Sequence, residues 1–127
     1  MSERTVVKVP NIPAPSAPLS LGIKSGGLLF VSGQIPADLV AGELCTGTIA
    51  EKTRVCLRNI NTIAKASGTD LCKSVKLTVF LTDMNDFAEV NGAYTEFFPS
   101  DPPARSCVQV AGLPRGVNVE IEAIIEL

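Results

Sequence analysis

The sequence predicts an α+β fold in which a single sheet carries two helices on one of its faces. Segments with strand-like alternation and segments with helical periodicity follow one another in the order β, ββ, α, β, α, ββ. Each helical segment has one apolar stripe, so each can cover the sheet from one side only. The 127 residues suffice for one domain with a proper core, and we expect residues 1–127 to form it.

The N-terminal part predicts three short strands. Residues 4–9 (RTVVKV) form a strand candidate, and the proline-rich residues 10–18 form an extended connector. Proline fits neither a helix interior nor a central strand, which excludes both for the connector. Residues 19–36 predict a hairpin that turns at Gly26 and Gly27.

Residues 47–68 predict the first helix, which opens with a capping box formed by Thr48 and Glu51. Its buried stripe recurs at spacings of three and four, with two further apolar residues beside it. The stripe and its neighbours are Ile49, Thr53, Cys56, Ile60, Ile63, Leu57 and Ala64. Residues 74–81 alternate as a strand, and residues 85–98 predict the second helix.

Residues 103–127 predict a final hairpin that turns at GLPRG, residues 112–116. Valines and isoleucines alternate with polar residues on both strands, and we expect the apolar rows to face the helices. Arg105, Cys107 and Glu120 would then lie together on the helix-free face. The turn would place Arg105 and Glu120 as close neighbours across the two strands.

Two interpretations of this pair remain open. An exposed structural ion pair between Arg105 and Glu120 is the commoner arrangement. However, Phe80 and Ile124 are expected on the same face, and the chain is 46% hydrophobic with a mean hydropathy of +0.30. Such a face is typical of one covered by neighbouring subunits. In a covered cleft the guanidinium suits a carboxylate, and the glutamate suits proton transfer.

Composition excludes several functional classes. The absence of histidine removes Ser–His–Asp and Cys–His systems and the commonest metal ligand. The four cysteines form no CxxC pair and therefore predict no metal site, and Cys107 has no histidine to activate it. Without a signal-peptide pattern, their thiols are expected to be reduced. The net charge of −2 and few aromatic residues argue against nucleic acid. No apolar run could span a membrane. The N-terminus shows no signal-peptide pattern, so we expect an intracellular, cytoplasmic protein, with the mitochondrial matrix as an alternative.

Three blocks of the sequence resemble the reactive-intermediate deaminase (Rid, formerly YjgF) family. They are FVSGQIP (30–36), VFLTDMNDFAEVNGAY (79–94) and PPARSCVQVAGLPRGVNVEIEAI (102–124), and the similarity covers residues 15–127. The resemblance implies a chorismate-mutase-like homotrimer with a central β-barrel, outer helices and ligand clefts between subunits. It also implies cofactor-free hydrolysis of 2-imino acids, such as 2-iminobutanoate and 2-iminopropanoate, to 2-oxo acids and ammonia. Such imines are released by pyridoxal-phosphate enzymes such as threonine dehydratase.

The resemblance further implies roles for single residues. Arg105 would clamp the substrate carboxylate, and Glu120 would hold or activate the attacking water. Cys107 would bind substrate chiefly through its backbone, while Gly33 and Asn91 would line the cleft. Without the resemblance, those last two would be interpreted as a turn glycine and a helix-surface amide.

Leu19 departs from the family pattern, because relatives commonly have a cleft tyrosine there. Leucine supplies an apolar wall to the substrate-binding site but no hydroxyl. Two alternative functions stay open, of which the absent hydroxyl favours the first. One is a non-enzymatic binder of small carboxylates, and the other is an endoribonuclease or translation inhibitor, an activity also ascribed to some relatives.

Overall fold

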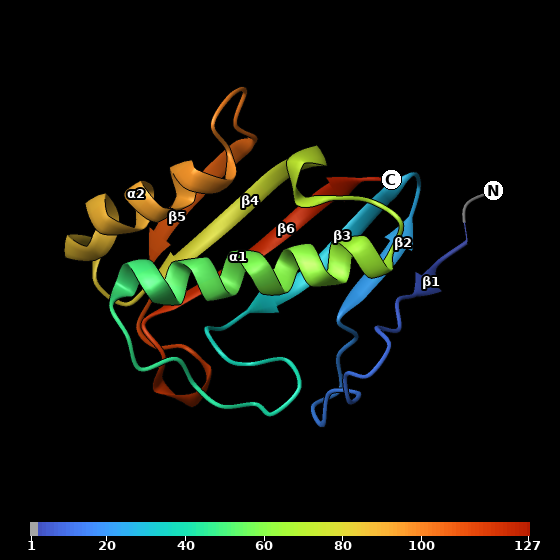
Figure 1. The fold of residues 1–127 in the computed structure, drawn as a ribbon, viewed down its shortest axis with the longest axis horizontal. Helices are drawn as coiled ribbons and strands as arrows, with labels where there is room; N and C mark the ends of the chain where they lie inside the picture. The colour runs from blue at the N-terminus through green and yellow to red at the C-terminus, as the bar shows by residue number, and fades with distance from the viewer. Residues whose placement is uncertain (1–2) are drawn as a thin grey trace.

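Figure 1 shows one mixed sheet with both helices lying across the same face. The computed structural model describes residues 3–127, and the strand order is β1-β2-β3-β6-β4-β5. The elements are β1 (Thr5–Val6), β2 (Gly22–Ser25), β3 (Leu28–Gln34), α1 (Ile49–Ala66), β4 (Ser74–Leu81), α2 (Phe87–Phe97), β5 (Ala104–Gln109) and β6 (Val119–Glu126). The predicted α+β class, element order and one-sided helix layer are confirmed.

The beginning of α1 confirms the predicted capping box. The Glu51 backbone N–H donates to the hydroxyl of Thr48 at 3.2 Å, and the Glu51 carboxylate accepts from the Thr48 backbone N–H at 3.5 Å. All seven residues of the predicted stripe and its flank are buried. The Glu89 carboxylate, from α2, accepts from the backbone N–H of Ala50 at 3.1 Å. This contact satisfies a free donor in the first turn of α1 and fixes α2 beside it.

The core lies between the helices and the inward rows of the sheet. Leu77 and Val79 of β4 and Ile121 and Ile125 of β6 are completely buried there. Burial of one such side chain contributes about 1.5–3 kcal/mol, so these rows fix which face of each strand meets the helices. Within residues 3–127, neither helix combines the length and apolarity needed to cross a membrane.

The predicted final hairpin is wrong, because β4 separates β5 from β6. β4 pairs in parallel with β5 and antiparallel with β6. A strand–helix–strand unit returns its second strand parallel to the first, and here β4, α2 and β5 form such a unit. Residues 110–118 then pass the end of β4, where the Val110 N–H donates to Leu81 at 2.8 Å and Asn118 accepts from Thr82 at 3.3 Å.

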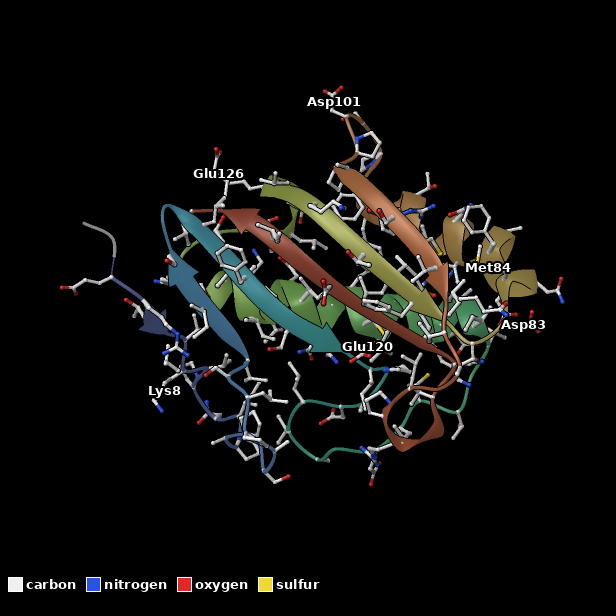
Figure 2. All side chains as sticks on the ribbon, turned by 180° about the vertical axis from the view of Figure 1, so that it is seen from behind. Lys8, Asp83, Met84, Asp101, Glu120 and Glu126 are labelled. Atoms are coloured by element: carbon white, nitrogen blue, oxygen red, sulfur yellow. The ribbon has the colours of Figure 1, made fainter. Side chains whose placement is uncertain are left out.

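The face of the sheet turned away from α1 and α2, here called the helix-free face, retains large apolar side chains. Figure 2 shows the molecule from this side. Register places Phe80 opposite Glu120 and Phe30 opposite Ile124, all on outward rows. Phe30 is 40% exposed and Val108 is 43% exposed. The predicted placement of Phe80 and Ile124 is therefore confirmed.

Candidate functional site

Arg105 and Cys107 lie on the helix-facing side of β5, which corrects the prediction that they share the helix-free face with Glu120. Their register partners on β4 are Leu77 and Val79, both completely buried under the helices. β5 is the edge strand beside α2, so its inward row need not be apolar throughout. The predicted proximity of Arg105 and Glu120 within one chain is therefore also wrong.

One face of α2 holds the guanidinium of Arg105. Phe87, Asn91 and Tyr94 are spaced at i, i+4 and i+7, which places them in one row along the helix. The Arg105 Nη1 group donates to Asn91 Oδ1 at 2.8 Å. Its Cζ atom lies 4.8 Å from the ring centre of Tyr94 and 5.5 Å from that of Phe87. We call these three residues the α2 cradle, and its cation–π contacts contribute about 0.5–1 kcal/mol each at partly exposed sites.

The guanidinium of Arg105 has no carboxylate partner among residues 3–127. The ion pairs found there are Arg54–Glu96 and Lys65–Asp70. The cradle is neutral and accepts one N–H bond, so further donors of the guanidinium remain available. An open hollow of about 450 Å³ adjoins Arg105, lined by α2 and the proline-rich segment before β5. The arrangement suits a small anion, and a carboxylate fits the fork of the guanidinium.

Replacement of Tyr94 by phenylalanine is expected to raise the free energy of unfolding by about 1 kcal/mol, because a buried hydroxyl without a partner is costly. The Tyr94 hydroxyl is buried and has no hydrogen-bond partner within residues 3–127. Urea unfolding at fixed protein concentration measures the change. Tyr94→Leu, which removes the ring, should lower stability instead. A loss of stability in Tyr94→Phe would contradict the assignment and indicate a partner for the hydroxyl.

Glu120 lies on the helix-free face of β6 (Figure 2), opposite Phe80 and beside Gly33 of β3. Burial raises the pKa of its carboxyl group, and the nearby charge of Glu122 raises that pKa further. Within residues 3–127 the carboxylate has no ion-pair partner. A partly buried carboxyl group whose pKa is raised above its ordinary value is suited to general acid–base catalysis.

The predicted site residues fall into two groups. Arg105, Asn91 and Cys107 lie on the helix-facing side, between β5 and α2. Glu120 and Gly33 lie together on the other side, and Gly33 shares an open hollow of about 370 Å³ with Leu19, which is 50% exposed. Along β4 the two groups are three residues apart, or about 10 Å, and they face opposite sides of the sheet. A single chain therefore does not bring both charges onto one small ligand.

Cys107 has the properties of a site wall rather than of a nucleophile. Burial raises the pKa of its thiol, and the positive charge of Arg105 only partly opposes that shift. The thiol form is therefore favoured over the reactive thiolate. In the part of the chain that the structure describes, no three His, Cys, Asp or Glu side chains gather as a metal site.

The family model described as Endoribonuclease L-PSP matches residues 9–127. The chain belongs to this family, the Rid proteins. This Rid protein is 50% identical over 117 residues to RutC family protein y4sK of Sinorhizobium fredii, covering 92% of this chain and 93% of that protein. It is 42% identical over 121 residues to the 2-iminobutanoate/2-iminopropanoate deaminase of Bos taurus, covering 95% and 88%. E. coli TdcF, whose crystal structure was solved with bound serine, is 38% identical in sequence to this chain. The two structures superpose with a TM-score of 0.89, covering 97% of this chain and 98% of TdcF.

Proposed function

We propose that this Rid protein hydrolyses 2-imino acids, such as 2-iminobutanoate and 2-iminopropanoate, to 2-oxo acids and ammonia. The observation that carries the proposal is the guanidinium of Arg105, held by neutral groups beside an open hollow and free of any carboxylate of the described chain. The Bos taurus relative is named for this deamination. TdcF was solved with serine, which resembles a 2-imino acid in having a carboxylate next to a nitrogen-bearing carbon.

In the proposed mechanism, Arg105 binds the carboxylate through two parallel hydrogen bonds and thereby orients the C=N carbon. Glu120 accepts a proton from the water that attacks the carbon of the protonated imine, which gives a neutral tetrahedral carbinolamine. Glu120 then delivers that proton to the nitrogen. The C–N bond breaks and ammonia departs, while the remaining hydroxyl gives its proton to the Glu120 carboxylate, which passes it to solvent, and the 2-oxo acid forms. Cys107, Gly33, Asn91 and Leu19 complete the substrate site, and no cofactor takes part.

Because the two groups of site residues face opposite sides of one sheet, we propose that each cleft forms between subunits. The expected assembly is a chorismate-mutase-like homotrimer whose sheets enclose a central barrel. Its neighbours would cover the apolar helix-free face, on which Phe30 and Val108 are exposed. Glu120 of one subunit would then act on a ligand bound by Arg105 of the next.

A coupled assay tests the proposed function. Threonine dehydratase in excess supplies 2-iminobutanoate, so that the release of 2-oxobutanoate is limited by imine hydrolysis. The wild-type protein is expected to raise that rate in proportion to its concentration, above the spontaneous rate in buffer. An unchanged rate would refute the proposal.

The alternative of a non-enzymatic carboxylate binder is favoured by Leu19, whose side chain is exposed beside the Gly33 hollow and offers no hydroxyl to a water. An unchanged rate in the coupled assay, combined with calorimetric binding of 2-oxobutanoate, would select this function.

The family model carries the description endoribonuclease. The net charge of −2 and the absence of histidine weigh against RNA cleavage by this chain. The compartment we expect is the cytoplasm, with the mitochondrial matrix as the alternative.

A further inference from the structure

Gly33 and Glu120 are in close contact across β3 and β6. Gly33 lies where the pairing of the two strands shifts its register, between Val31 and Gln34. A Cβ atom added to Gly33 would lie 2.6 Å from Oε2, 2.9 Å from Cδ and 3.2 Å from Cγ of Glu120. The first two distances are shorter than non-bonded atoms tolerate. The carboxylate therefore occupies the space that any side chain at position 33 would take.

The backbone at this position does not itself require glycine. The glycines with positive φ are Gly26, Gly27, Gly42, Gly68 and Gly116, and Gly33 is not one of them. Its φ lies in a range that alanine adopts without strain. The restriction on residue 33 is thus one of space beside Glu120.

We propose that Gly33 is a positioning residue for Glu120: by lacking a side chain, it lets the carboxylate stand against the backbone of β3. This inference rests on the role proposed above for Glu120 and gives Gly33 a part in the site beyond lining it. A methyl group would turn the carboxylate away from β3 and out towards solvent. Glu120 could still transfer a proton, but its carboxylate would no longer be directed at the attacking water.

Gly33→Ala tests the proposal, with Gly112→Ala as its matched control. A Cβ atom at Gly112 would meet no atom within 4 Å, and the φ of Gly112 is not positive. Gly33→Ala is expected to lower kcat about tenfold or more and to leave KM within about twofold, because it misplaces a proton-transfer group but not the carboxylate clamp. Gly112→Ala should match the wild type. A wild-type kcat in Gly33→Ala would overturn the proposal.

A double-mutant cycle separates positioning from a general structural effect. In a Glu120→Gln background, where the carboxylate is already gone, Gly33→Ala should cause no further loss of kcat. An equal loss in both backgrounds would show that Gly33 acts independently of Glu120, contrary to the proposal. If Gly33→Ala alone fails to fold, Gly33→Ala with Glu120→Ala should recover the fold, since the clashing atoms are removed. Failure of that recovery would also count against the proposal.

Carbon-13 NMR titration of the Glu120 carboxyl group gives a readout that does not depend on deamination. Its pKa is raised chiefly by burial, so in Gly33→Ala it should fall towards its ordinary value as the group moves into water. Gly112→Ala should leave it unchanged. A fall in the pKa without any imine hydrolysis by the wild type would uphold the positioning role and refute the proposed function. An unchanged pKa in Gly33→Ala would refute the positioning role itself.

Discussion

Arg105→Ala is expected to lower kcat/KM for 2-iminobutanoate by about 10²–10³-fold, since two hydrogen bonds between charged groups contribute about 3–4 kcal/mol together. The guanidinium is held by Asn91 and two aromatic rings, and the described chain offers it no competing carboxylate. Its loss therefore removes the group that binds the substrate carboxylate without disrupting an ion pair. The coupled assay, run over a range of dehydratase and protein concentrations, measures the change.

Two further variants show whether geometry or charge carries the effect of Arg105. Arg105→Lys keeps the positive charge but loses the planar fork, so about a tenfold loss is expected. Arg54→Ala removes an arginine of α1 that pairs with Glu96 at an exposed site, and it should retain activity within about twofold. Circular dichroism confirms that each variant is folded. Wild-type rates in a folded Arg105→Ala protein would contradict the proposed mechanism.

Glu120→Gln is expected to lower kcat by about 10²–10⁴-fold with little change in KM, the range typical of losing a general acid–base group. Glutamine keeps the shape of the side chain and removes its ability to take a proton. In the wild type, kcat should fall as the pH drops through the pKa of Glu120, which lies above its ordinary value because of burial and the charge of Glu122. In Glu122→Gln the acid limb of the pH profile should move to lower pH, because one of the two causes is gone. An active Glu120→Gln enzyme would contradict the role of this carboxylate.

Mixing the two inactive variants tests whether the cleft lies between subunits. In a trimer reassembled from equal amounts of Arg105→Ala and Glu120→Gln chains, about a quarter of the clefts would combine an intact arginine with an intact glutamate from its neighbour. Activity should therefore return to about that fraction of the wild-type value. Chains whose sites were complete in one subunit would show no recovery.

Local sequence signals predicted most of the fold. The capping box at Thr48, the α1 stripe and the alternation along β4 and β6 depend on neighbours a few residues away, and the structure confirms them. One residue departs from the alternation: Val75 belongs to the same row as Leu77 but is 48% exposed, where the pairing of β4 with β6 shifts register. Strand partners are a different matter. The alternation of residues shows which side chains share a side of β5, but not which side meets the helices. The GLPRG segment indicates a turn, but it does not show which strand β6 pairs with after that turn.

The residues of the site were proposed from the sequence, but the way they lie relative to one another was misjudged. The order of β4, α2 and β5 was visible in the sequence, and a parallel return was the expected form of such a unit. In a parallel pair of strands, Arg105 and Cys107 lie beside Leu77 and Val79 and face the helices as they do. The row of Phe87, Asn91 and Tyr94 at helical spacing was the signal for the α2 cradle. Helical spacing would place Phe87 in the core with Val90 and Tyr94, yet it is 37% exposed and packs on the guanidinium. The close contact between Gly33 and Glu120 could not be predicted from the sequence, because it depends on a register shift between β3 and β6, which are far apart in the chain.

The position of β6 has a consequence for how the molecule is made. β6 follows the other five strands in the sequence, yet it lies between β3 and β4 and is hydrogen-bonded to both. Until residues 119–126 leave the ribosome, the hairpin of β2 and β3 and the unit of β4, α2 and β5 have no strand to join them. Both then present open, apolar edges to other nascent chains. The sheet therefore cannot be completed before β6 is available, and these edges stay unpaired until that point of synthesis.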